Sequence, residues 1–136
     1  MVDPETRLVL DTSAYGRFRQ GHAKVLDLLA AADSILLPTV VLGELEAGFE
    51  LGLRARENRT TLTELLDEPF VGVLPVTTSV ARRYGLVFAQ LRRAGTPIPV
   101  NDIWIAATVL DCGGHLVTFD RHFEKVTGLD CTLLES

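Results

Sequence analysis

Apolar residues occur along this chain in two patterns: short, continuously apolar runs and longer runs with helical spacing. Because strands that are buried on both faces read as unbroken apolar runs, the short runs predict a parallel sheet covered by helices on both faces. Gly72 and Pro75 favour an edge position for the strand that contains them. The expected strands are residues 7–10, 34–37, 70–76, 116–119 and 131–134, and the expected helices begin after Asp11 and span residues 22–32, 39–53, 56–67, 77–94 and 101–112.

Composition narrows the class of protein. The chain has 136 residues, of which 47% are hydrophobic, so we expect one folded domain over residues 1–136. No apolar run reaches the roughly 18 residues that cross a bilayer. The first residues lack the basic and apolar regions of a signal peptide, so we expect a cytoplasmic protein. Cys112 and Cys131 form no CxxC pair and are expected as buried free thiols.

Four acidic residues, far apart in the sequence, occupy positions where an α/β fold exposes a site. Asp11 ends an apolar run and Asp120 follows another. Ligands of open α/β sheets bind beyond the carboxyl ends of the strands, where both acids are expected. Glu44 lies on the apolar side of its helix, and Asp102 begins a nearly all-apolar helix. Gathered carboxylates repel one another unless a cation lies between them, so the pattern predicts a magnesium or manganese site and phosphoryl chemistry.

The first two acids also have ordinary structural roles. Asp11 can be a helix N-cap, although Thr12 or Ser13 could cap the helix and leave Asp11 free for a ligand. Glu44 can be a solvated glutamate at the margin of the apolar stripe, but its position beside that stripe, together with Asp11, favours a functional site.

The same choice applies to the later acids. Asp102 in a first helical turn, with Asn101 as the expected cap, can simply complement the helix dipole. That dipole would also keep Asp102 ionised, as a metal ligand must be. Asp120 can be a turn aspartate paired with Arg121. Thr118, two residues earlier, is a further candidate to position a metal-bound water.

Four blocks of sequence, taken in order, carry a resemblance to a known family. They are Val9-Leu10-Asp11-Thr12-Ser13-Ala14, Val41-Leu42-Gly43-Glu44-Leu45, Asn101-Asp102-Ile103-Trp104-Ile105-Ala106-Ala107 and Leu116-Val117-Thr118-Phe119-Asp120-Arg121-His122-Phe123. The chain resembles a PIN domain over nearly its whole length, and in particular the VapC-type toxins of bacterial and archaeal toxin–antitoxin pairs.

The resemblance implies a three-layer α/β/α fold with a parallel five-stranded sheet. It also implies a magnesium-dependent endoribonuclease, with manganese as the alternative ion, a cognate antitoxin partner and a homodimer. Metal ligation would be led by Asp11 and Asp102, with Glu44 and Asp120 completing the acidic pocket. The residues implied to orient these groups or to position water are Thr12, Ser13 and Thr118.

The RNA would be attracted by cations around this pocket, because arginine matches the geometry of phosphate groups. Tyr15 and Phe18 could stack on bases or pack in the core. His22, His115 and His122 occur in no recognisable catalytic pairing, so we expect them to be structural or RNA-contacting. The candidate cations are Arg17, Arg19, Lys24, Arg82, Arg83, Arg92, Arg93 and Arg121.

Two other functions stay open at the level of sequence. The chain could be a non-catalytic PIN-like binding module, although all four acidic positions are occupied by acids, which disfavours this. It could also be another metal-dependent nuclease that acts on DNA. A nuclease assay with and without EDTA distinguishes a binding module from a metal-dependent nuclease. A comparison of RNA with DNA substrates distinguishes a ribonuclease from a DNA nuclease.

Overall fold

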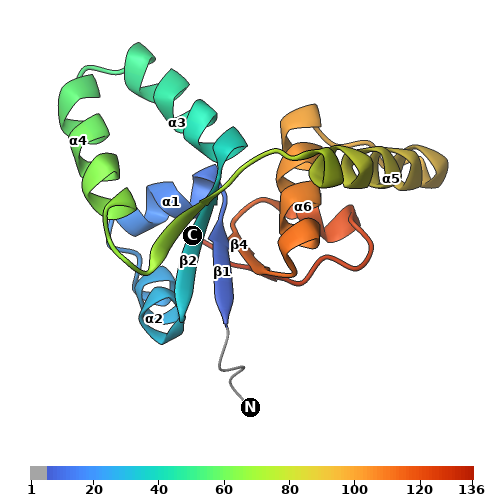
Figure 1. The fold of residues 1–136 in the computed structure, drawn as a ribbon, viewed down its shortest axis with the longest axis horizontal. Helices are drawn as coiled ribbons and strands as arrows, with labels where there is room; N and C mark the ends of the chain where they lie inside the picture. Colours follow the sequence, from blue (N-terminus) through green and yellow to red (C-terminus); the bar gives the residue numbers. More distant parts are fainter. Residues whose placement is uncertain (1–5) are drawn as a thin grey trace.

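The computed structural model describes residues 6–136, so the expectation that the first residues are not a signal peptide falls largely outside the described chain. Its centre is one parallel sheet of five strands in the order β3-β2-β1-β4-β5 (Figure 1). This confirms the predicted parallel sheet and the edge position of β3. The strands are β1 (Arg7–Leu10), β2 (Ser34–Pro38), β3 (Val71–Leu74), β4 (His115–Thr118) and β5 (Cys131–Leu133).

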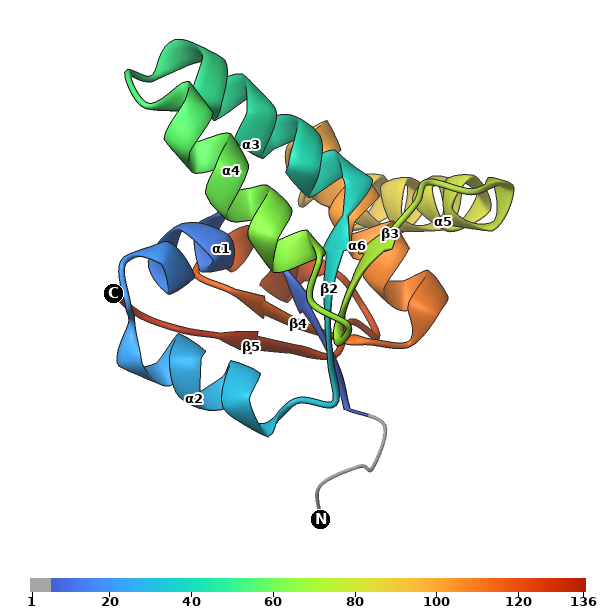
Figure 2. The same ribbon diagram turned by 60° about the vertical axis from the view of Figure 1, so that its left-hand side comes forward.

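Helices cover both faces of this sheet and give it the predicted three layers. In Figure 1, α1, α2 and α4 lie to one side of the strands, and α5 and α6 lie to the other. Figure 2 shows α3 and α4 as a helical pair that extends beyond the carboxyl ends of the strands. The helices are α1 (Thr12–Arg19), α2 (Ala23–Ala31), α3 (Thr39–Leu51), α4 (Ala55–Leu66), α5 (Thr78–Ala94) and α6 (Val100–Cys112), with a 3₁₀ turn, η1 (Arg121–Lys125), after β4.

The core lies on the central strands, as their apolar sequences predict. Val9 and Leu10 of β1 and Leu116 and Val117 of β4 are fully buried. Removing such side chains from water is the main favourable contribution to folding. No helix within residues 6–136 is both long enough and apolar enough to cross a membrane.

Helix α6 differs from the expectation at its start and agrees with it at its end. It begins at Val100 with Pro99 as the N-cap, so the prediction that Asn101 caps it is wrong. Proline suits this start because its fixed φ matches an extended cap and no N–H is lost. The helix ends at Gly113, whose φ of 68° is left-handed. Gly114 then passes so close to Val9 that an added Cβ would lie 3.0 Å from its side chain.

Candidate metal centre

The four predicted acids line one cavity at the carboxyl ends of β1 and β4. It has a volume of about 440 Å³ and is open to solvent. The ends of parallel strands meet at one edge of a sheet, and the first turns of α1 and α6 meet the middle of α3 there. The residues that line it are Asp11, Thr12, Ser13, Glu44, Pro99, Asn101, Asp102, Ile105, Asp120 and His122.

Asp11 is held rigidly by hydrogen bonds to both carboxylate oxygens. Its Oδ1 accepts from the Ala14 backbone N–H at 2.8 Å and from the Ser13 hydroxyl at 2.7 Å. Its Oδ2 accepts from the hydroxyl of Thr118, at the end of β4. Asp11 is therefore the N-cap of α1, and the prediction that Thr12 or Ser13 caps this helix instead is wrong. The structural role and the position in the cavity coexist in one side chain.

Of its two expected roles, to orient an acid or to position water, Thr118 has the geometry of the first. Its side chain is completely buried, so it does not reach the cavity to position water. Its hydroxyl donates to Asp11 and accepts from the backbone N–H of Asp120 at 2.9 Å. Ser13 makes a second link of this kind, because its hydroxyl accepts from the Phe119 backbone N–H at 3.0 Å. The two hydroxyls thus attach the segment after β4 to the start of α1.

Glu44 reaches the cavity from the middle of α3, where the sequence pattern placed it beside the apolar stripe. Its Oε1 accepts from the Thr12 hydroxyl at 2.7 Å, and its Oε2 accepts from the side-chain amide of Asn101 at 2.6 Å. Asn101 therefore orients Glu44 from α6, a role that the sequence analysis missed. Nothing in local periodicity pairs these two residues, because the contact depends on how α3 crosses α6.

Asp102 and Asp120 share a partner that the sequence analysis also missed. The Nδ1 atom of His122 lies 2.9 Å from Asp102 Oδ2 and 3.1 Å from Asp120 Oδ1. Within residues 6–136, these three side chains are the group whose potential ligand atoms all lie within 4.8 Å of one another. The sequence analysis expected His122 to be structural or RNA-contacting and did not place it beside these acids. His122 follows Asp120 by two residues, and this spacing was the feature of the sequence that could have placed it beside that acid.

Electrostatics agree with a shared negative site. Burial raises the pKa of Asp11 above its ordinary value, against hydrogen bonds that lower it, and the charge of Asp102 raises it further. Burial also raises the pKa of Asp102, with added repulsion from Asp120 and Glu44 and an opposing hydrogen bond to His122. A cation between these carboxylates would reverse the repulsion and favour their ionised forms.

The donor set fits a hard divalent cation. Four carboxylates offer oxygen atoms, which Mg²⁺, Mn²⁺ and similar ions prefer, and the open cavity leaves room for retained water. Asp11 and Glu44 lie outside the tightest group of donors, although both face the same cavity. The cavity as a whole, and not this tightest group alone, is therefore the candidate ion site.

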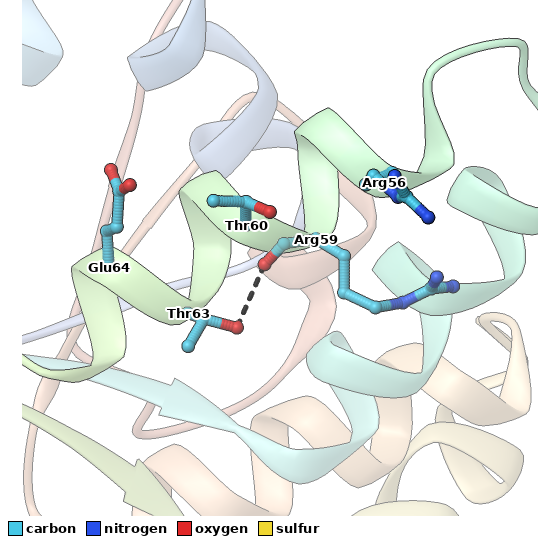
Figure 3. Close-up of a pocket in the computed structure, with 5 residues that line it drawn as sticks. All are labelled: Arg56, Arg59, Thr60, Thr63 and Glu64. Atoms are coloured by element: carbon cyan, nitrogen blue, oxygen red, sulfur yellow. Dashed lines mark hydrogen bonds between the residues drawn. The ribbon is translucent and has the colours of Figure 1, made fainter.

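A second hollow, of about 340 Å³, lies along α4 and carries different chemistry (Figure 3). It is lined by Arg56, Arg59, Thr60, Thr63 and Glu64, and the Thr63 hydroxyl donates to the backbone oxygen of Arg59. The Arg59 side chain turns to α3, where it forms ion pairs with two glutamates. Glu64 is the one carboxylate among the residues that line this hollow, so the hollow lacks the cluster of acids that a metal centre requires.

Several surface expectations are refined by the fold. Tyr15 is 3% exposed and belongs to the core, so the base-stacking interpretation is wrong for this residue. Among the candidate cations, Arg83 pairs with Asp111, and the Arg17 guanidinium lies 5.2 Å from the centre of the Phe119 ring. The two cysteines are free, as expected, but half-buried rather than buried.

Comparisons with known proteins agree with this geometry. The PIN domain family model matches residues 8–129. The chain is 28% identical to ribonuclease VapC5 of Mycobacterium tuberculosis over 120 residues, which is 88% of this chain and 87% of the relative. It is 30% identical to the plasmid stability protein StbB of Pseudomonas syringae pv. tomato over 131 residues, 90% of this chain and 94% of that protein.

Solved structures share the fold. The VapBC2 complex of Rickettsia felis, bound to a promoter DNA fragment, contains a chain that superposes with a TM-score of 0.83 at 21% identity, covering 96% of this chain and 100% of that one. VapBC from Salmonella typhimurium, also bound to DNA, contains a chain with a TM-score of 0.83 at 24% identity, covering 93% and 97%.

Proposed function

Because this chain belongs to the PIN domain family, we propose that it is a magnesium-dependent endoribonuclease and the toxin of a toxin–antitoxin pair. One observation carries the proposal: four acids from separate parts of the chain line a single open cavity at the carboxyl end of the sheet. The relative VapC5 is a ribonuclease by name, and it aligns with 88% of this chain. Manganese is the alternative ion.

All four acids would hold the ion. Asp11 and Asp102 lead the ligation of the ion, and Glu44 and Asp120 complete the set. An ion held by these residues would make a bound water more acidic and would offset negative charge on the phosphate. The protein holds the acids in place beforehand, so little reorganisation is needed when the substrate arrives.

The hydroxyls and the amide provide that preorganisation. Thr118 and Ser13 fix the orientation of Asp11 from two sides. Thr12 and Asn101 fix the two oxygens of Glu44. Each of these four side chains donates its hydrogen bond to a carboxylate oxygen, and such bonds favour the ionised form that a cation requires.

The partners follow from the structural neighbours. Several of these are VapBC structures, one of them described as a member of the VapBC family of toxin–antitoxin systems, and we propose that an antitoxin covers the cavity of this chain. We also propose that residues 1–136 form a single domain, that the protein assembles as a homodimer, and that it acts in the cytoplasm, where RNA and antitoxin are both present.

The test is RNA cleavage by the purified chain, with Mg²⁺ and with EDTA. We expect cleavage that requires the divalent ion and that is lost in Glu44→Gln. The matched control is Glu46→Gln, which changes the same residue type on the same helix at a side chain bonded to Arg59 instead of the cavity. Cleavage that survives EDTA and Glu44→Gln would refute the proposal. Cleavage of DNA but not RNA would indicate a metal-dependent DNA nuclease instead. A folded protein that cleaves neither would indicate a non-catalytic binding module.

A further inference from the structure

The side chain of His122 lines the acidic cavity and is held there by the turn that carries it. It lies in η1, directly before Phe123, whose side chain is 1% exposed and anchors the turn in the core. On the other side, the Asp120 backbone N–H is bound by Thr118. The turn is therefore fixed at both ends, and the imidazole is held beside the acids although 42% of its side chain is exposed.

The separations of the donor atoms agree with a coordination shell. Nδ1 of His122 lies 2.9 Å from Asp102 Oδ2 and 3.1 Å from Asp120 Oδ1. Adjacent ligand atoms in an octahedral shell with bonds of about 2.1 Å lie about 3.0 Å apart. Nδ1 can therefore occupy a ligand position adjacent to each of the two oxygens, and the oxygens themselves lie within 4.8 Å of each other, as two ligands of one ion do.

Such a set differs chemically from a site made only of oxygen. Mg²⁺ prefers oxygen ligands and retains much of its water, whereas first-row transition ions also accept imidazole nitrogen. Histidine is the most common metal ligand in proteins for this reason. Two carboxylates and one imidazole thus favour Mn²⁺ over Mg²⁺ relative to the carboxylates alone.

We propose that His122 is a nitrogen ligand of the metal centre and that it shifts the preference of this site from Mg²⁺ toward Mn²⁺. Ligation uses the Nδ1 lone pair and leaves the ring proton on Nε2. This inference rests on the proposed function, because it specifies the ion of the same centre. A histidine that only bridges the two carboxylates by donating an Nδ1 hydrogen bond is the competing interpretation.

The variants His122→Asn and His122→Ala separate the two interpretations. An asparagine amide can still donate to the carboxylates but has no nitrogen lone pair for a metal, so a bridging role would be preserved and nitrogen ligation would be lost. The matched control is His115→Ala, which removes a histidine that is bonded to Thr132 and Asp130 and does not line the cavity. Circular dichroism confirms that each variant is folded.

Two measurements on the purified protein read out metal binding without any substrate. Isothermal titration with MnCl₂ and MgCl₂ gives both affinities, and pulsed electron paramagnetic resonance of bound Mn²⁺ detects a directly coordinated ¹⁴N nucleus. We expect a nitrogen signal in the native protein and in His115→Ala but not in either His122 variant. We also expect the ratio of Mn²⁺ to Mg²⁺ affinity to fall by about tenfold in both His122 variants.

The outcomes distinguish this inference from the proposed function. If the native protein binds Mn²⁺ without a nitrogen signal, or if the affinity ratio is unchanged in His122→Asn, the histidine is not a ligand while the acidic metal centre stands. If affinity for both ions rises in His122→Ala, the histidine competes with the metal and the inference is overturned. If the native protein binds neither ion, the inference and the proposed metal-dependent function both fail.

Discussion

Asp11 combines two roles in one side chain, and substitutions can separate them. Asp11→Asn keeps an oxygen that can accept from the Ala14 N–H and the Ser13 hydroxyl, so the cap of α1 survives. Its new amide would face Thr118, whose hydroxyl can rotate to accept instead of donate. Asparagine caps helices about as well as aspartate. We therefore expect the free energy of unfolding to change by less than about 1 kcal/mol.

Asp11→Ala removes all of these contacts. The lost cap costs about 1 kcal/mol, and the two hydroxyls that lose their acceptor cost about 1 kcal/mol each. Relief of the buried charge offsets part of this sum, since burial already raises the pKa of Asp11. The net expectation is a loss of about 2–3 kcal/mol for Asp11→Ala, roughly 2 kcal/mol more than for Asp11→Asn.

Urea unfolding followed by circular dichroism in EDTA measures both values, and RNA cleavage with Mg²⁺ measures function. Both variants should lose cleavage, while only Asp11→Ala should lose substantial stability. Equal stability of the two variants would refute the reasoning about the cap and its hydroxyl partners. Retained magnesium-dependent cleavage by folded Asp11→Asn would refute the assignment of Asp11 to the metal.

Three further outcomes follow from the same geometry. Thr118→Val keeps the shape of the side chain but removes the hydroxyl that donates to Asp11. This should lower the free energy of unfolding by about 1–3 kcal/mol and slow RNA cleavage. Urea unfolding and cleavage rates that both match the native protein would contradict this expectation. Saturating Mg²⁺ or Mn²⁺ should raise the melting temperature, with about 2.7 kcal/mol of stabilisation at a hundred times the dissociation constant, and scanning calorimetry that shows no response to either ion would count against a metal centre. In EDTA, burial raises the pKa of Asp102, so the folded state binds a proton at this carboxylate more readily than the unfolded state does. The contribution of Asp102 to the free energy of unfolding therefore grows as pH falls from 7 toward 4. The stability of the native protein relative to Asp102→Asn should increase over that range, and a difference in urea unfolding that stays constant with pH would reject this linkage.

Much of the fold could be predicted because each element carries its own signal. Continuous apolar runs specified all five strands to within a few residues, and turn residues marked most of the helix ends. The N-caps of α1 and α6 were predicted wrongly. At α1, three neighbouring side chains could each serve as the cap, and the observed cap, Asp11, also accepts from Thr118 of the distant strand β4. At α6, the cap is Pro99, which makes no side-chain hydrogen bond to the helix, so a search for a capping side chain could not find it.

The sequence by itself determined the order of the elements and the placement of Asp11 and Asp120 just beyond two strands, because periodicity and turn chemistry act over a few residues. Only the tertiary structure decided which side chains meet: Asn101 with Glu44, and His122 with Asp102. These contacts join residues 57 and 20 positions apart, respectively. They depend on the angle at which α3 meets α6 and on the anchoring of η1. Packing of whole elements sets both, and no local pattern encodes them.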